Sequence, residues 1–442
     1  MDTTIVAIAS PIGTGAVSLI RLSGAHSLEI ARRAIGRGSL PLARAAGLRK
    51  IRDHAGLVLD EGVMVCFLGP HSYTGEDVVE FTGHGGVAVT KRVLERLIEV
   101  GAQPAQPGEF TQRAFMNGRM DLTQAEAVMD LISAQTSLAM RSASEQLEGR
   151  LGQIANEMRS VLLGATAQLE AHIDFPEEDI NPEVGAALQK VLSNELERVG
   201  DLLKTSSQGR ILREGVRTVI YGEPNVGKSS LLNHLLGYQR AIVSAREGTT
   251  RDVIEEVISI RGIPLRLIDT AGVRESDDEI EKEGIEMTRE QLLRADLVLE
   301  VKDLGQPFSE SKAVVPEGVK TLMVLNKKDL ECSSWDGVQG VRISCETGEG
   351  FGDLEEAITR LLELDEESWG VHSVAVNARH HSCLLRVQTS LAAAVASMEI
   401  CEAPEFTSLS LREALSGIGE IVGMVDTEEI LGEIFGRFCI GK

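Results

Sequence analysis

The chain has 442 residues, 43% hydrophobic and 25% charged, so it is long enough to form two or three domains, each with its own core. Its net charge of −23 argues against nucleic-acid binding through a generally basic surface, although a local basic patch remains compatible with it. Six scattered cysteines without a C-x-x-C pair argue against a zinc site or a disulfide framework. No stretch approaches membrane-spanning length and the first residues do not resemble a signal peptide, so we expect a cytoplasmic protein without a membrane anchor.

Residues 1–118 mix short strand-like runs with glycine and proline punctuation, which predicts a small α+β domain. The strand-like runs are VSLIRLSG, GVMVCFLGP and DVVEF, and VTKRVLERLIEVG has a helical pattern. Residues 119–213 are then predicted to be helical. Asp121 can cap a helix with Gln124 as its reciprocal partner, and apolar residues recur behind that cap at helical spacing.

A strand-like run, VRTVIYG, opens residues 214–368, in which strand and helix signals alternate as in a parallel α/β sheet. Residues 369–442 return to a helical pattern. One interpretation is that an α/β domain is inserted into a helical domain whose two halves flank it. The alternative is three separate domains in series.

The segment GEPNVGKSS follows VRTVIYG and fits the phosphate-binding pattern G-x-x-x-x-G-K-[ST] from Gly222 to Ser229. Its glycines allow backbone N–H groups to surround phosphates at the start of a helix. Lys228 then supplies positive charge to the β and γ phosphates, and Ser229 supplies a hydroxyl ligand for Mg²⁺.

Three further polar segments follow in order, each with a nucleotide-binding interpretation. Thr249 and Thr250 in EGTTRD can cover the γ phosphate, with Thr250 also reaching Mg²⁺, and Asp269 in DTAG can hold Mg²⁺ through water. Asp329 in NKKD can accept the N1–H and 2-amino hydrogens of guanine, which adenine does not present. The predicted GTP contacts are Asn225, Val226, Gly227, Lys228, Ser229, Ser230, Ser244, Ala245, Arg246, Glu247, Gly248, Thr249, Thr250, Asp269, Thr270, Ala271, Gly272, Asn326, Lys327, Asp329, Ser344 and Cys345.

The residue that positions the attacking water is not evident from these motifs. Ras-like enzymes place a glutamine directly after DxxG, whereas this chain has Val273 there. The following segment, RESDDEIEKEG, is rich in carboxylates, and taken singly each of them is more often a solvated charge than a catalyst.

Several long blocks resemble the MnmE (TrmE) family of tRNA modification GTPases, within the TrmE-Era-like GTPases. They are TGEDVVEFTGHGG, PGEFTQRAFMNGRMDLTQAEAVMDLI, HIDFPEEDI and the terminal FCIGK, together with the GTPase motifs. The resemblance runs end to end. It implies a folate-binding-like α+β domain that also dimerises (1–118), a helical domain in two halves (119–213 and 369–442) and an inserted Ras-like G domain (214–368).

The resemblance also implies activation by potassium when the G domains of two subunits pair. Asn225 matches the family's potassium-binding asparagine, and Ser244, Arg246 and Thr249 would complete the site. A monovalent cation there neutralises phosphate charge where an arginine finger otherwise acts. Glu281 matches the family's water-orienting glutamate.

The family implies, finally, a homodimer that modifies C5 of the wobble uridine of certain tRNAs with a 5-formyl- or methylene-tetrahydrofolate donor. The expected partner is MnmG (GidA), in a heterotetrameric or larger complex, and FAD is expected on that partner only. Arg21, Glu80 and Arg119 would line the folate site; Arg119 stands where some relatives have lysine, which keeps the charge but not necessarily the geometry.

The terminal FCIGK has the cysteine spacing of a prenylation box, but Gly441 and Lys442 violate that pattern. The family resemblance instead makes Cys439 a participant in the modification chemistry and Lys442 a folate contact. A purely structural tail is the alternative. For the whole chain, the competing functions are a switch GTPase of ribosome or RNA assembly and a folate-dependent aminomethyltransferase; the folate-like blocks disfavour the first and the complete G domain the second.

Overall fold

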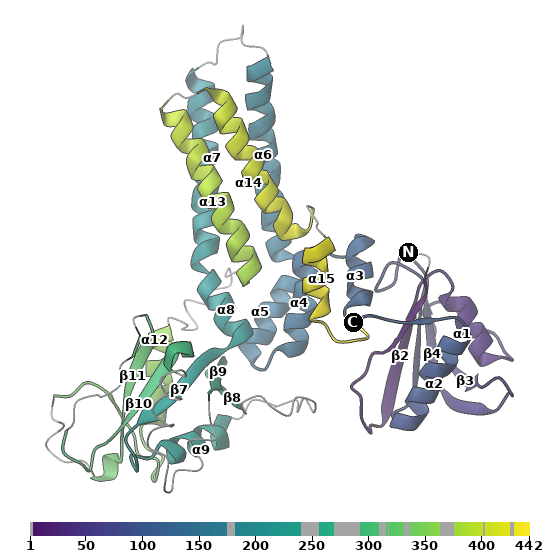
Figure 1. Cartoon of the computed structure of the whole chain (residues 1–442), viewed down its shortest axis with the longest axis horizontal. Helices are drawn as coiled ribbons and strands as arrows, with labels where there is room; N and C mark the ends of the chain where they lie inside the picture. The colour runs from purple at the N-terminus through teal and green to yellow at the C-terminus, as the bar shows by residue number, and fades with distance from the viewer. Residues whose placement is uncertain are drawn as a thin grey trace. The chain divides into compact units, whose positions relative to one another are not determined.

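A computed structural model of the chain describes residues 3–174, 182–239, 256–268, 292–308, 315–316, 318–330, 335, 337–362, 375–400, 403–424 and 428–442 (Figure 1). The chain forms two compact units. The first unit comprises Met1–Met129, Gly152–Arg159 and Ile418–Lys442, and the second comprises Asp130–Leu151 and Ser160–Gly417. Helices α4, α6 and α14 contribute residues to both. No helix of the described part of the chain is long and apolar enough to cross a membrane.

The first unit contains a six-stranded sheet in the order β3-β4-β5-β2-β1-β6, antiparallel except for the β1–β6 pair. The strands are β1 (Ile5–Ile8), β2 (Val17–Ser23), β3 (Gly47–Arg52), β4 (Val58–Phe67), β5 (Val78–His84) and β6 (Gln103–Pro104), and the helices are α1 (Ser27–Ile35), α2 (Val87–Glu99), α3 (Glu109–Met116) and α15 (Glu428–Gly436). Helices α1 and α2 pack on one face of the sheet, where alternate strand residues such as Ile20, Met64 and Phe81 are buried. The runs predicted from sequence correspond to β2, β4, β5 and α2, and α15 lies within the predicted helical residues 369–442, whereas β1, β3, β6, α1 and α3 were not predicted.

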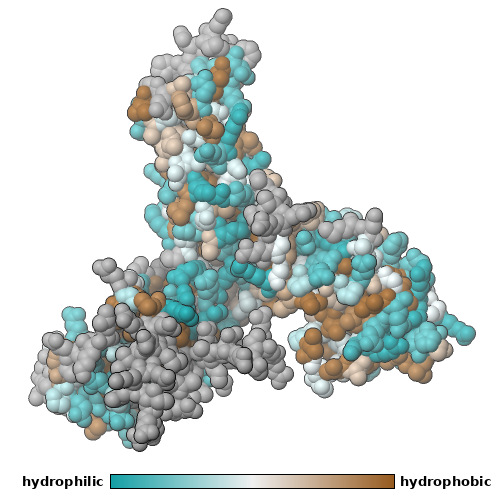
Figure 2. Space-filling model, in the orientation of Figure 1, coloured by the Kyte–Doolittle hydropathy of each residue, from teal (hydrophilic) through white to brown (hydrophobic). Residues whose placement is uncertain are grey.

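The opposite face of this sheet is covered at β1, where Phe110 of α3 is buried with Ile5 and Ala7, but it exposes apolar side chains at β2, β3 and β4. Val17, Leu48 and Val63 are 64%, 60% and 41% exposed. Leu48 pairs with Val63, which pairs with Thr82. Figure 2 shows hydrophobic residues gathered over the surface of this unit. An exposed apolar face of this kind is typical of an interaction surface.

In the second unit, α7 (Pro182–Lys204) packs along α13 (Ala378–Glu399), although the second sheet lies between them in sequence. The other helices are α4 (Leu122–Ser133), α5 (Ser137–Leu147), α6 (Arg150–Asp174), α8 (Ser206–Glu214) and α14 (Pro404–Val422). Figure 1 shows α6, α7, α13 and α14 side by side, and Glu170 of α6 accepts hydrogen bonds from Arg412 of α14. The predicted cap of α4 is confirmed, because Gln124 N–H donates to Asp121 Oδ1 at 2.9 Å and Asp121 N–H donates to Gln124 Oε1 at 3.0 Å.

The second sheet also has six strands, in the order β12-β11-β10-β7-β9-β8. Its elements are β7 (Val216–Gly222), α9 (Lys228–Gln239), β8 (Glu256–Ile260), β9 (Ile263–Leu267), β10 (Leu297–Asp303), β11 (Lys320–Asn326), the 3-10 helix η1 (Lys328–Leu330), β12 (Val341–Arg342) and α12 (Phe351–Leu362). The prediction of a parallel sheet is wrong for one edge, since β8 runs antiparallel to β9. Arg261 and Gly262, with φ of 47° and 85°, form the tight turn that produces this hairpin.

Candidate functional site

The predicted phosphate-binding loop joins β7 to α9, so the motif has the strand before it and the helix after it that phosphate binding requires. Asn225 has a φ of 62°, a left-handed conformation that asparagine tolerates better than most residues. Gly227 has a φ of 98°, and a Cβ atom there would lie 2.2 Å from Asn326 Nδ2. The loop therefore depends on a glycine at this position for both conformation and space.

Lys228, the first residue of α9, turns its ammonium group back toward the loop. Its Nζ donates hydrogen bonds to the carbonyl oxygens of Gly222 at 2.9 Å and Glu223 at 2.8 Å. Burial lowers the pKa of this amine. A partly desolvated cation held among carbonyl groups is well placed to be stabilised by an anionic phosphate group. Ser229 and Ser230 follow it in the first turn of α9.

The carboxyl end of β11 lies against the phosphate-binding loop. Asn326, which is only 2% exposed, donates from Nδ2 to the carbonyl oxygen of Val226 at 2.9 Å. Its Oδ1 accepts a hydrogen bond from the Cys345 N–H at 3.2 Å. One buried amide thus joins the phosphate-binding loop to the SCETGEG loop, both of which the sequence predicts to contact GTP.

Lys327 is held by a carboxylate that the sequence analysis missed. Its Nζ lies 2.7 Å from Asp303 Oδ2 and donates to the Asn225 carbonyl oxygen at 3.1 Å. Asp303 is 9% exposed and ends the buried strand β10. The sequence did contain a signal for Asp303, because ligand-binding residues often follow the carboxyl ends of buried parallel strands and Asp303 occupies such a position.

Asp329 presents an exposed carboxylate in η1. Ser344 Oγ donates to its Oδ1 at 2.6 Å, and the Ser344 N–H donates to the Glu349 carbonyl oxygen. These bonds set the orientation of the carboxylate that is predicted to meet guanine. The neighbouring thiol of Cys345 is uncharged at neutral pH, because burial raises its pKa to about 11.

Several predicted site residues lie outside the described part of the chain. They are the GTP-contacting residues 244–250 and 269–272, and Glu281. The structure therefore brings together the phosphate-binding loop, the NKKD segment and the SCETGEG loop. Within the described residues, no cluster of three or more His, Cys, Asp or Glu side chains is arranged to hold a metal ion.

A second site forms in the first unit around Arg21 and Glu80, which are paired across strands β2 and β5. Arg21 Nε lies 2.8 Å from Glu80 Oε1, and the guanidinium carbon lies 5.1 Å from the Tyr73 ring centroid and 5.7 Å from that of Phe110. Arg21 Nη1 is buried without a hydrogen-bond partner among the described residues. A buried guanidinium nitrogen that has a free N–H group is suited to donate a hydrogen bond to an acceptor atom of a ligand. Tyr73 and Phe110 were not predicted from the sequence.

The C-terminal residues pack against the same unit. Phe438 is buried, and the carbonyl oxygen of Cys439 accepts a hydrogen bond from the Gly108 N–H at 3.4 Å. Gly441 has a φ of 100°, and a Cβ atom there would lie 2.5 Å from the Ile8 carbonyl oxygen. Only glycine fits this position without strain. The tail is therefore a docked element, and the Cys439 thiol remains exposed.

Lys442 is half-buried and lies within electrostatic range of both Arg21 and Glu80. Burial lowers the pKa of its amine, Arg21 lowers it further, and Glu80 opposes both effects. Three of the four predicted folate contacts are thus neighbours. Arg119 is exposed beside Gly75, and none of its described contacts reaches Arg21, Glu80 or Lys442.

Comparisons with known proteins match the whole chain. A family model described as the MnmE helical domain matches residues 122–439, and one described as the GTP-binding protein TrmE N-terminus matches residues 4–119. The tRNA modification GTPase MnmE of Akkermansia muciniphila is 50% identical over 100% of this chain and 99% of its own length. Proteins of the same description from Aquifex aeolicus and Acinetobacter baumannii are 41% and 42% identical over 100% of this chain and 100% and 99% of their own lengths.

Proposed function

Because this chain belongs to the MnmE (TrmE) family of tRNA modification GTPases, we propose that it hydrolyses GTP to drive modification of C5 of the wobble uridine, position 34, in certain tRNAs. The products are aminomethyl or carboxymethylaminomethyl forms. The observation that best supports GTP binding is that the Asn326 side chain hydrogen-bonds to both Val226 and Cys345. These two bonds hold the phosphate-binding and base-binding segments together.

In this proposal the nucleotide is oriented at both ends by described residues. Lys228 exchanges its bonds to loop carbonyl groups for bonds to the β and γ phosphates, and Asp329 accepts the two N–H groups of guanine. Ser229 and Thr250 hold Mg²⁺, which neutralises phosphate charge when bound. Glu281 orients the attacking water.

Potassium is proposed to act where other GTPases use an arginine finger. The exposed Asn225 side chain would hold it together with Ser244, Arg246 and Thr249. The left-handed backbone at Asn225 supports this role, because asparagine combines tolerance of that conformation with a side-chain oxygen ligand.

The second site is proposed to bind a 5-formyl- or methylene-tetrahydrofolate donor. Glu80 accepts hydrogen bonds from the amino-amide edge of the pterin, and Arg21, whose buried Nη1 lacks a partner in the described part of the chain, donates to a ring acceptor. Lys442 and Arg119 supply positive charge for the carboxylates of the ligand. The exposed Cys439 thiol on the docked tail is proposed to take part in the modification chemistry.

Further proposals concern assembly. The exposed apolar sheet face bearing Val17, Leu48 and Val63 supports homodimer formation through the first unit. The packing of α7 against α13 supports insertion of a G domain (214–368) into a helical domain. MnmG (GidA), carrying FAD, is the proposed partner in a heterotetrameric or larger cytoplasmic complex.

Nucleoside analysis of tRNA from cells that lack this protein tests the proposal. We expect loss of the modified wobble uridine, with recovery when the wild-type chain is restored but not when Lys228→Ala is supplied. Unchanged wobble uridines in the deleted cells would reject the proposed function and favour a switch GTPase of RNA assembly.

A further inference from the structure

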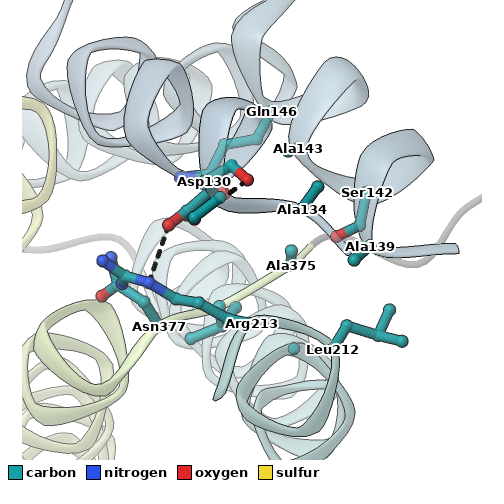
Figure 3. A pocket seen from close by; sticks show the side chains of 13 residues that line it. Asp130, Ala134, Ala139, Ser142, Ala143, Gln146, Leu212, Arg213, Ala375 and Asn377 are labelled. Atoms are coloured by element: carbon teal, nitrogen blue, oxygen red, sulfur yellow. Dashed lines mark hydrogen bonds and ion pairs between the residues drawn. The ribbon is translucent and has the colours of Figure 1, made fainter. Parts of the chain in front are cut away.

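A small cavity lies within the second unit, where α4, α5 and α8 meet the segment that leads into α13 (Figure 3). Its volume is about 30 Å³, which is enough for a water molecule. Small side chains make up much of its wall: Ser133, Ala134, Ala139, Ser142, Ala143, Gly209 and Ala375. Close-packed helices resist displacement, whereas a cavity between helices leaves room for one to shift against another.

The cavity is polar on the side of α13. Asn377, which is 6% exposed, caps α13 by accepting a hydrogen bond from the His380 N–H at 2.8 Å. Its Nδ2 is buried without a hydrogen-bond partner among the described residues. A water molecule in the cavity would satisfy this donor, so the space is suited to water rather than to an apolar side chain.

Helix α8 connects the helical elements to the second sheet through two arginines one turn apart. Arg213 Nε lies 2.7 Å from Asp130 Oδ1 of α4, across the cavity (Figure 3). Arg210 Nη1 lies 3.5 Å from Asp296 Oδ1, and Asp296 Oδ2 accepts a hydrogen bond from the Arg217 N–H of β7 at 3.0 Å. Helix α8 is therefore bound through Arg210 to the residue that precedes β10 and through Arg213 to α4.

The same helix leads directly into the phosphate-binding loop. After Glu214 the chain turns at Gly215, with a φ of 78°, and enters β7, which ends at Gly222. Leu212 of α8 is 3% exposed within the hydrophobic core of the sheet. A displacement of β7 must therefore be accompanied by α8.

A second contact joins the β8–β9 hairpin to α5, the helix whose Ala139, Ser142 and Ala143 line the cavity. A Cβ atom on Gly262, in its turn, would lie 2.8 Å from Leu138 Cγ of α5. In sequence this hairpin lies between the two segments predicted to contact the γ phosphate and Mg²⁺, around Thr250 and Asp269. Both α5 and α8, which touch the sheet, are also walls of the cavity.

We propose that this junction couples the nucleotide state of the sheet to the helical elements, with the Asp130–Arg213 ion pair transmitting the movement of α8 to α4. The inference rests on the proposed function and deepens it. Arg213 acts as a positioning residue, and the hydrated cavity provides the space in which α8 moves. Breaking the ion pair should uncouple GTP hydrolysis from tRNA modification without impairing hydrolysis itself.

The test uses full-length Asp130→Asn and Arg213→Gln variants with two readouts. Purified protein reports the GTP hydrolysis rate, and tRNA from cells carrying only the variant reports wobble-uridine modification. We expect unchanged hydrolysis and about a tenfold loss of modification, a size typical of coupling between sites. The charge-reversed double variant Asp130→Arg, Arg213→Asp should restore modification. Arg141→Gln, which breaks the Arg141–Glu145 pair at 3.1 Å on the outer side of α5, is the matched control and should change neither readout.

Ser142→Val is a second variant, because it fills the cavity without touching the ion pair, and it should also lower modification alone. Normal modification in Asp130→Asn, Arg213→Gln and Ser142→Val would overturn the inference. A proportional loss of both readouts without rescue by charge reversal would also overturn it, because that pattern indicates a merely structural contact. Failure of the proposed function gives a different result. In that case wobble-uridine modification would not depend even on the wild-type protein, whereas failure of this inference alone would appear only in the variants.

Discussion

The buried amide of Asn326 donates to the carbonyl oxygen of Val226 at 2.9 Å, so the end of β11 bears directly on the phosphate-binding loop. This contact is possible only because residue 227 lacks a side chain: a Cβ atom on Gly227 would lie 2.2 Å from Asn326 Nδ2. The two halves of a nucleotide site that lie about a hundred residues apart in sequence are thus one hydrogen-bonded unit. The predictions below follow from this site and from the docked C-terminal tail.

Asp329→Asn should weaken GTP binding by about a hundredfold or more, because it replaces a charge-assisted acceptor of two guanine N–H groups by a neutral amide. The Ser344 hydroxyl can still donate to the new side chain, so folding should be preserved. Titration calorimetry with GTP measures the change. Asp353→Asn, at an exposed carboxylate in α12, is the control. Wild-type affinity in Asp329→Asn would remove this residue from base recognition.

Potassium dependence should be lost in Asn225→Gly. Glycine accepts the φ of 62° at this position, so the variant removes the side-chain oxygen without straining the backbone. We expect the wild-type protein to hydrolyse GTP much faster in K⁺ than in Na⁺ and the variant to show nearly equal rates. Steady-state hydrolysis in the two salts at matched ionic strength measures this. Equal rates in the wild-type protein would refute the potassium site.

Lys442→Gln should raise the free energy of unfolding at neutral pH. The folded-state pKa of Lys442 lies below its ordinary value of 10.5, so the native state disfavours the charged amine. The resulting cost is fully present below the lowered pKa and disappears as pH rises toward 10.5. The stability gain of the variant should therefore shrink as pH rises. Urea unfolding at several pH values measures it, with the exposed Lys91→Gln as the control. A gain that grows with pH would contradict this assignment.

Gly441→Ala should release the C-terminal tail. A side chain at a φ of 100°, 2.5 Å from the Ile8 carbonyl oxygen, should cost about 1–3 kcal/mol of docking free energy. Amide hydrogen exchange of residues 438–442 should accelerate. Gly436→Ala, at the end of α15, meets nothing within 4 Å and should leave exchange unchanged. Equal protection of the tail in both variants would show that this glycine is not required.

Cys439→Ser should spare GTP hydrolysis and impair wobble-uridine modification, since the thiol is exposed on a docked tail far along the chain from the phosphate-binding loop. Nucleoside analysis of tRNA from complemented cells, together with hydrolysis assays, measures both effects. Ile440→Ala, at a neighbouring residue that is 60% exposed, controls for perturbation of the tail. Normal modification in Cys439→Ser would return this cysteine to a structural role.

Much of the secondary structure could be predicted because it depends on local signals. The cap formed by Asp121 and Gln124 and the strand–loop–helix context of Lys228 need only neighbouring residues. The antiparallel strand β8 was missed, although Arg261 and Gly262 provided a turn signal between two apolar runs.

The sequence by itself determined the family and the class of nucleotide and predicted the candidate site residues, since these depend on which side chains occupy a motif. Only the tertiary structure decided which distant residues meet. The Asp303–Lys327 and Asp130–Arg213 ion pairs, the aromatic rings over Arg21 and the docking of Gly441 against Ile8 all join segments brought together by folding. Such contacts leave no local periodicity, because they arise from packing between elements rather than from the conformational preferences of neighbouring residues.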